Sequence, residues 1–256
     1  MLFRSADPNQ EIQRAIDVVV TGGIVRLQAG RHEPESSVVL PARAVTLAGE
    51  LDGDNQPLSI VDATQNGSAV VVTAGATSGT TLRDLVVTGG DTVLGGGLRV
   101  NNGASPSIVN CTFEFNVATL GGGVYCGSEA EPTFTSCRIE ANGDAQTDVG
   151  GGLYASPTAL PELLDTTICG NTPDQIFGPF TTDSASCEDS LCDNCLNSCR
   201  PDLDGDGRVD GADMGLFLIA WGPCSGFCPA DFNGDGLVDG GDLGLLLLEF
   251  GACAGN

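Results

Sequence analysis

Between residues 80 and 171 the sequence repeats itself at a nearly fixed spacing, and this period limits the folds open to the chain. Three segments carry the repeat: SPSIVNCTFEFN at 105–116, EPTFTSCRIEAN at 131–142 and LPELLDTTICGN at 160–171. The spacing between the first two is twenty-six at every position, and the third follows after twenty-nine. A weaker copy one period earlier contributes Leu82, Leu85, Val87 and Gly90. A repeat of this length indicates a stack of similar supersecondary units.

The pattern inside each unit predicts strands. Apolar residues alternate with other residues, as in Cys111-x-Phe113 and Leu98-x-Val100, which is the period of a strand and not of a helix. Glycine triplets recur with the same spacing, beginning at Gly95, Gly121 and Gly150. Short strands joined by tight turns, once in every repeat, predict coils of a parallel β-helix, stacked at the strand spacing of about 4.8 Å.

An asparagine closes each unit, at Asn116, Asn142 and Asn171. Asparagine tolerates turn conformations, and its amide can both donate and accept hydrogen bonds. The coil model therefore predicts that these three side chains stack and bond to one another.

The N-terminal segment predicts a helix that covers the open end of the stack. Asp7 is suited to cap it, Pro8 to occupy its first turn, and Ile12, Ile16 and Val19 fall on one face.

After this helix the solenoid is expected to begin. Val25 and Leu27 precede Val45 and Leu47 by twenty positions, which predicts two early stacked strands. About six coils are expected up to about residue 178, with atypical end coils.

These residues resemble the right-handed parallel β-helix, or pectin-lyase-like, superfamily. The resemblance rests on IQRAID, VRLQAGRHEPE, the GGGVY triplets and NCTFEFN, and it covers residues 1–180. It implies a mainly β fold, a right-handed parallel β-helix solenoid with an N-terminal capping helix. That fold hosts lyases, hydrolases, adhesins and structural proteins, so it does not imply one activity.

A second, separate repeat places two acidic twelve-residue loops near the C-terminus. They read DLDGDGRVDGAD at 202–213 and DFNGDGLVDGGD at 231–242. Their alternate oxygen-bearing residues, with Gly207 and Gly236 at the sharp turn, match the calcium-loop pattern. The predicted ligands are Asp202, Asp204, Asp206, Arg208 (backbone carbonyl), Asp210 and Asp213, then Asp231, Asn233, Asp235, Leu237 (backbone carbonyl), Asp239 and Asp242. The alternative is a pair of solvated acidic turns. Val209 and Val238, at loop position 8, are expected to pair the two loops.

A helix is expected after each loop, whereas Pro201 and Pro229 disfavour a helix before it. The predicted apolar faces are Met214, Phe217, Leu218 and Trp221, and then Leu243, Leu246, Leu247 and Phe250. Each unit is therefore half of an EF-hand.

Over residues 202–253 this loop–helix pair resembles the dockerin module. The resemblance implies two Ca²⁺ ions as cofactors and a cohesin-like or other cell-surface partner. Residues at loop positions 10 and 11 help to recognise cohesins, and here they are Gly211, Ala212, Gly240 and Gly241 instead of the common Ser/Thr pair. Residues 201–256 are predicted to form this module, after a Cys-rich linker at 181–200.

Charge and cysteine content restrict the surroundings and the partners. The formal net charge is −24, and all ten basic residues are arginines, which argues against nucleic acid and anionic membranes as partners. No segment is long and apolar enough to insert into a membrane. Seven of the 11 cysteines lie from Cys187 onward, which favours disulfides in a secreted or cell-surface protein. The start, MLFRSADPNQ, has too short an apolar run for a signal peptide.

Zinc is the alternative to disulfides. Its ligands would be Cys192, Cys195, Cys224 and Cys228. In the solenoid, Cys126 is expected to be a core thiol, and Cys111 and Cys137 are expected to stack one coil apart.

Two outward columns are candidate sites. Arg99, Tyr125 and Tyr154 would form a ladder that could stack sugar rings, or simply be exposed strand residues. In the other column, Glu114 and Glu140 would lie about 5 Å apart, the spacing of a retaining glycosidase. They could also chelate a cation or coat a solvated face.

The acidic pair lies beside Arg138, and no sequence feature raises the pKa of either acid. The resulting hypothesis is a secreted, non-catalytic, calcium-binding β-helix that binds or displays at polysaccharide or cell surfaces. The alternative is a polysaccharide lyase or glycoside hydrolase that uses Glu114, Arg138 and Glu140.

Overall fold

The computed structural model describes residues 11–183, 185–192, 201, 203–204, 208–223, 230, 232, 237–248 and 250–252. The chain divides into two compact units, Met1–Ser190 and Leu191–Asn256. In the described part of the chain, no helix is both long and apolar enough to cross a bilayer.

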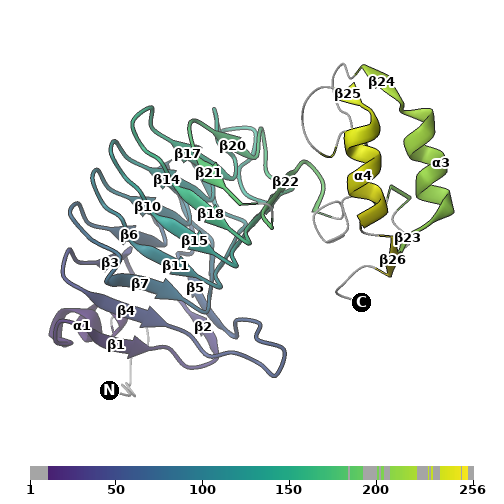
Figure 1. Ribbon diagram of the computed structural model, residues 1–256. Coiled ribbons are helices and arrows are strands. Elements are labelled where there is room, and N and C mark those ends of the chain that lie inside the picture. Colours follow the sequence, from purple (N-terminus) through teal and green to yellow (C-terminus); the bar gives the residue numbers. More distant parts are fainter. Residues whose placement is uncertain are drawn as a thin grey trace. The chain divides into compact units, whose positions relative to one another are not determined.

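The first unit is a parallel β-solenoid of about six turns, as the repeat predicted (Figure 1). Sheet A contains β1 (Gly23–Arg26), β4 (Val45–Ala48), β7 (Thr80–Arg83), β11 (Ser107–Val109), β15 (Thr133–Thr135), β18 (Glu162–Leu164) and β21 (Thr181–Thr182). Sheet B contains β2 (Gly30–His32), β5 (Ser59–Asp62), β8 (Leu85–Thr88), β12 (Thr112–Glu114), β16 (Arg138–Glu140), β19 (Thr167–Cys169) and β22 (Cys187–Asp189). Sheet C contains β3 (Val38–Leu40), β6 (Val70–Val72), β10 (Leu98–Val100), β14 (Val124–Cys126), β17 (Leu153–Ala155) and β20 (Ile176–Phe177). A short fourth pair, β9 (Asp91–Leu94) and β13 (Val117–Leu120), lies between sheets B and C along the chain.

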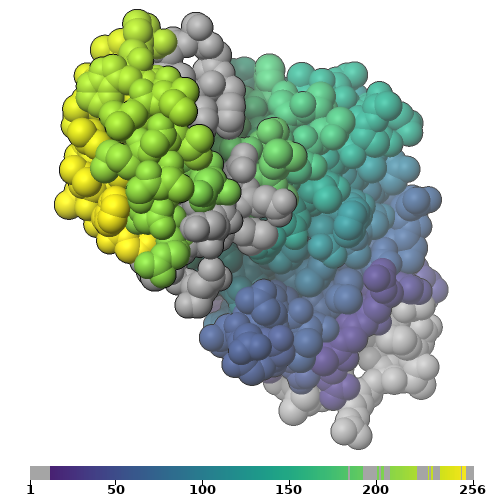
Figure 2. Space-filling view, turned by 90° about the vertical axis from the view of Figure 1, so that its right-hand side faces the viewer, coloured from purple at the N-terminus to yellow at the C-terminus, as the bar shows by residue number. Residues whose placement is uncertain are grey.

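The strand registers confirm the central repeat. Ser107 pairs with Thr133 and Thr133 with Glu162, which reproduces both spacings read from the sequence. The space-filling view shows the same order as bands of colour from purple to green along the stack (Figure 2). The strands β21 and β22 continue the stack beyond residue 180, where the sequence predicted its end.

The register predicted for the first coil was wrong. Val25 pairs with Leu47 and Gly23 with Val45, whereas the sequence pattern paired Val25 with Val45. The strands are thus displaced by two positions from the predicted register. Because side chains on a strand alternate with a period of two, these two registers bury the same faces. The pattern of apolar residues cannot distinguish them.

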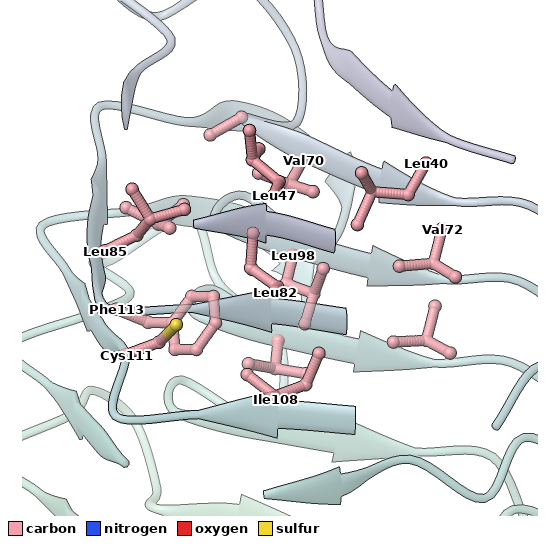
Figure 3. Packing of buried hydrophobic residues seen from close by; sticks show 14 of the residues in the cluster. Leu40, Leu47, Val70, Val72, Leu82, Leu85, Leu98, Ile108, Cys111 and Phe113 are labelled. Atoms are coloured by element: carbon pink, nitrogen blue, oxygen red, sulfur yellow. The ribbon is translucent and has the colours of Figure 1, made fainter. Parts of the chain in front are cut away.

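Inward side chains from equivalent positions pile up into one apolar core. Figure 3 shows Leu47, Leu82 and Ile108 one above another, and the registers of sheet A pair them in this order. Burial of such a column stabilises each coil only through its neighbours, which is why the repeat must be stacked to fold.

The helix α1 (Glu11–Val18) covers the first coil, as predicted. Ile12 and Ile16 are buried in the core, and Val19 packs against it. The predicted capping residues Asp7 and Pro8 lie outside the described residues.

The three repeat asparagines form a buried ladder, as predicted. The Asn116 Nδ2 donates to Asn142 Oδ1 at 3.0 Å, and Asn142 Nδ2 donates to Asn171 Oδ1 at 3.0 Å. Each amide also donates to a main-chain carbonyl of the previous coil, and the top Asn171 donates to Gln175 Oε1 at 2.8 Å. Buried amides in this arrangement are satisfied on both sides, so the ladder specifies the coil register at little desolvation cost.

The left-handed backbone conformation does not fall on the asparagines. It falls on the preceding residue, which is Phe115 (φ 54°), Ala141 (φ 53°) and Gly170 (φ 63°). Asparagine is therefore selected here for its side-chain bonds and not for its tolerance of a positive φ.

The glycine triplets mark places where neighbouring coils come into close backbone contact. A Cβ on Gly122 would lie 2.5 Å from the Gly151 carbonyl oxygen and 2.7 Å from the Gly143 nitrogen. These atoms belong to the main chain and cannot move aside, so no side chain fits.

The described part of the second unit includes the two nine-residue helices α3 (Gly211–Ile219) and α4 (Gly240–Leu248). Four short strands complete its described part: β23 (Arg208–Val209), β24 (Gly222–Pro223), β25 (Leu237–Val238) and β26 (Gly251–Ala252). Its core is the cluster of Val209, Phe217, Ala230, Phe232, Val238 and Leu246. The Phe217 and Phe232 rings stack at a centroid distance of 6.0 Å.

The predicted pairing of Val209 with Val238 was wrong. The strand β23 pairs antiparallel with β26, and β24 pairs antiparallel with β25. Each loop thus pairs with the segment that follows the helix of the other loop. Val209 and Val238 are both buried in the same core, so the two loop–helix halves share one apolar cluster.

The predicted apolar helix faces are only half buried. Phe217 and Leu246 are in the core, but Leu218, Trp221, Leu247 and Phe250 are exposed. Each helix has only nine residues and belongs to a small unit, so the core has room for fewer of its apolar side chains than the sequence pattern predicted.

Candidate functional site

An acidic column runs up the outer face of sheet B. The strand registers place Asp62, Thr88, Glu114, Glu140 and Cys169 at successive levels of the same position. Glu114 and Glu140 are therefore neighbours on adjacent strands, with the strands about 4.8 Å apart. The structure brings together the acidic pair that the sequence predicted.

Arginines neutralise part of this column. The Arg138 Nη2 lies 2.5 Å from Glu140 Oε2, and Arg31 forms an ion pair with Asp62. The two arginines come from the second outward column of the same sheet, which also contains Thr112. On this face of sheet B, arginines of one column therefore lie beside carboxylates of the next.

Burial raises the pKa of the Glu114 carboxyl above its ordinary value of 4.5, and the adjacent negative charge of Glu140 raises it further. The positive charges of Arg138 and Arg31 oppose the shift. The sequence contained no signal for this effect, because the burial of an outward strand residue depends on the coils above and below it. A protonatable carboxyl beside an ion-paired carboxylate can in principle divide the roles of acid and base.

A disulfide-bonded cysteine follows Glu140 in the acidic column, which continues to Asp189. Cys169 and Cys192 are bonded, and Cys169 Sγ lies 3.9 Å from Glu140 Oε2. Cys187 is also disulfide-bonded. The bond at Cys192 excludes the alternative zinc site that included this sulfur. Cys195, Cys224 and Cys228 lie outside the described residues.

The thiols of Cys111, Cys126 and Cys137 are free and buried, as predicted for core positions. Burial raises the pKa of the Cys137 thiol to about 12 and that of Cys126 further still. They are protonated side chains of the core and contribute no nucleophile.

The tyrosine column lies on sheet C, away from the acidic column on sheet B. Arg99, Tyr125, Tyr154 and Phe177 occupy successive levels, and Phe177 was missed by the sequence reasoning. Phe177 follows Tyr154 after twenty-three residues, so the last coil is shorter than the repeat. Phe180 packs against the core.

The aromatic rings of this column cover one another. Tyr125 and Tyr154 stack at 5.4 Å with an interplanar angle of 1°, and Tyr154 and Phe177 stack at 5.6 Å and 9°. Because rings cover both faces of Tyr154, a ligand meets only its edge and its hydroxyl. A sugar ring therefore cannot stack on the face of Tyr154 in this arrangement.

The calcium-loop residues fall partly within the described residues. Asp204, Arg208, Asp210, Asp213, Leu237, Asp239 and Asp242 are described. Asp202, Asp206, Asp231, Asn233 and Asp235 lie outside the described residues.

The described part of both loops has the same construction. The buried Asp213 accepts hydrogen bonds from the Leu203, Asp204 and Asp210 nitrogens at 2.7, 3.2 and 2.8 Å. The buried Asp242 accepts from the Phe232 and Asp239 nitrogens at 2.8 and 2.9 Å. Two carboxyl groups are thus fully buried at equivalent places in the two loops, and the predicted metal ligands are all oxygen atoms. Such a donor set fits a hard divalent cation.

Comparisons with known proteins assign no family to the chain. No protein-family model matches the sequence, and no curated protein matches it. Among solved structures, the crystal structure of the pectin methylesterase from Aspergillus niger in deglycosylated form matches at a TM-score of 0.32 and 12% identity. The match covers 69% of this chain and 81% of that chain. The class of this protein, a parallel β-solenoid, therefore rests on the strand registers above.

Proposed function

We propose that this protein is a secreted or cell-surface β-solenoid that binds polysaccharide without cleaving it and attaches through a calcium-binding, dockerin-like C-terminal unit. Two Ca²⁺ ions would be held by the two acidic loops. The disulfides support an oxidising compartment.

The observation that carries the proposal is the duplicated burial of Asp213 and Asp242 at 0% exposure. A buried carboxylate is costly unless it is paired or coordinates a metal. Backbone N–H groups satisfy part of each charge, and a cation bound between alternate loop oxygens would compensate the rest. The other predicted ligands are the side chains of Asp202, Asp204, Asp206, Asp210, Asp231, Asn233, Asp235 and Asp239 and the carbonyls of Arg208 and Leu237.

The exposed apolar side chains of the same unit support a protein partner. They recur at the spacing of the two loops: Leu216, Leu218, Ile219 and Trp221, then Leu245, Leu247, Leu248 and Phe250. Such a surface on a soluble unit is typical of an interaction site. A cohesin-like or other cell-surface protein is the partner we propose, although loop positions 10 and 11 differ from the common cohesin-binding pair.

Calorimetric titration tests the calcium assignment. We expect two Ca²⁺ ions per chain with a Kd in the micromolar to millimolar range. Asp213→Ala should remove one of them, whereas Asp144→Ala, in a partly exposed turn of the solenoid, should leave the stoichiometry at two. Titration of the intact protein without any calcium binding contradicts the assignment.

A second function is favoured by the raised pKa of Glu114 beside the ion pair of Glu140 and Arg138. The alternative is a glycoside hydrolase or polysaccharide lyase in polysaccharide catabolism. Incubation with neutral and uronate polymers should release no reducing or unsaturated ends if the protein only binds. Release that is abolished by Glu114→Gln and by Glu140→Gln would establish the enzyme instead.

A further inference from the structure

Phe115 occupies a backbone position that suits glycine. Its φ is 54°, and the equivalent residues of the neighbouring coils are Gly89, Ala141 and Gly170, with φ of 70°, 53° and 63°. A bulky side chain in the left-handed region is an outlier, because its Cβ crowds the main chain. A residue kept in this conformation normally gains something from packing or from function.

Packing does not account for Phe115. Its side chain is 66% exposed, and it belongs to neither buried cluster of the described residues. The Phe115 nitrogen donates to the Ala141 carbonyl at 3.2 Å, so Ala141 lies directly beside it in the next coil. Gly89 takes the same place in the previous coil, since Thr88 pairs with Glu114.

No ring of the described residues stacks on Phe115, whereas Tyr154 of sheet C is covered on both faces. Neither Gly89 nor Ala141 has a side chain beyond Cβ, and no aromatic pair among the described residues includes Phe115. A Cβ on Gly89 would lie 2.1 Å from Asp62 Oδ1, so the Asp62 carboxylate fills the space beside Gly89. The Phe115 ring is open because no ring among the described residues stacks on it and the residue is 66% exposed.

The acidic pair begins at the adjacent residue. Glu114 precedes Phe115 in the chain and pairs with Glu140, which is held by Arg138. The exposed aromatic side chain that follows Glu114 adds an apolar surface beside a strand position that carries strong hydrogen-bond acceptors.

We propose that Phe115, Glu114 and Glu140 form a binding site for one sugar ring of an uncharged polysaccharide. This inference rests on the proposed polysaccharide binding and names its site and its ligand class. The C–H face of the sugar would pack on Phe115, and sugar hydroxyls would donate to the carboxylates. A uronate polymer is disfavoured, because its carboxylates would face Glu114, Glu140 and Asp62 on a chain with a net charge of −24.

Binding of oligosaccharides to the intact protein tests the proposal. The probes are xylo-, cello- and chito-oligosaccharides and an oligogalacturonate, measured by calorimetric titration at low and high salt. We expect at least one uncharged probe to bind with little dependence on salt, and the oligogalacturonate to bind more weakly, most of all at low salt.

Substitutions at two equivalent left-handed positions, Phe115 and Ala141, distinguish the effect of the aromatic ring from the effect of backbone strain. Phe115→Gly should weaken binding about tenfold or more, the scale of a lost aromatic contact. It should also raise the Tm by about 1–3 °C, because glycine relieves the left-handed strain. Ala141→Gly relaxes the same conformation without touching the ring, and it should leave binding unchanged.

The outcomes distinguish the site from the wider function. If an uncharged probe binds and Phe115→Gly leaves its affinity unchanged while Tyr154→Ala weakens it, the proposed site is wrong and polysaccharide binding stands. Preferential binding of the oligogalacturonate overturns the ligand class. Failure of the wild-type protein to bind any of the probes overturns both the site and the proposed polysaccharide binding.

Discussion

Glu114 shows how the solenoid changes the chemistry of an ordinary strand residue. It occupies an outward position, yet the coils on either side half bury it and set Glu140 beside it. Both effects disfavour the charged form, and burial is the larger. A column of identical charges is the consequence of a stacked repeat in which the same position is acidic in consecutive coils.

The raised pKa of Glu114 predicts a stability that falls as pH rises. The folded protein holds the proton more tightly than the unfolded chain, so the contribution is full below about pH 4.5 and is lost as pH rises through the folded pKa. Glu114→Gln should remove this dependence and stabilise the solenoid at pH 7 by less than about 1 kcal/mol. Urea unfolding of the wild type and the variant, from about pH 4 to about pH 8, measures how the free energy of unfolding depends on pH.

Glu140→Gln is the companion variant. It removes the neighbouring charge but leaves the burial, so the pH dependence should shrink without vanishing. Equal pH profiles for wild type and Glu114→Gln would show that the carboxyl is not perturbed.

At the scale of the element, the turns restrict the sequence more than the strands do. A strand position accepts any side chain that fills or covers the stack. The turn at Gly121–Gly123 accepts none at Gly122, because the next coil is in backbone contact with it.

Gly122→Ala should therefore destabilise the solenoid by about 2–4 kcal/mol, since neither main-chain neighbour can give way. Its matched control is Gly53→Ala, where a Cβ meets nothing within 4 Å and no left-handed backbone is involved. That substitution should be neutral or stabilise by up to about 1 kcal/mol. Chemical unfolding followed by the β-sheet signal distinguishes the two, and a similar loss in both variants would contradict the close-contact explanation.

At the scale of the whole molecule, the two units derive their stability from different sources. The solenoid has a continuous apolar core that runs from Ile12 to Ile168. The second unit has six buried apolar residues in its described core and two buried aspartates. A unit of that size depends on additional interactions to fold.

Chelation of calcium should therefore separate the thermal unfolding transitions of the two units. If free calcium is 100-fold above its Kd, each site contributes about 2.7 kcal/mol to folding. Excess EDTA should lower the transition that carries the helical signal and leave the sheet transition in place. The double variant Asp213→Ala and Asp242→Ala should behave in EDTA as it does in calcium, and a helical transition indifferent to EDTA in wild type would exclude calcium from its folding.

The sequence by itself determined the repeat architecture. A constant period, alternating apolar positions and recurring asparagines define which residues stack, because every coil must bury the same face in the same place. The Asn116–Asn142–Asn171 ladder and the Glu114–Glu140 neighbours follow from the spacing alone.

Only the tertiary structure decided what depends on contacts between coils or on breaks in the period. The register of Val25 on Leu47 and the place of Phe177 required coordinates, because the end coils abandon the repeat. The same holds for the pKa of Glu114, the mutual covering of Tyr125 and Tyr154, and the open ring of Phe115. Each is set by residues that lie a full coil away along the chain and that the solenoid places side by side.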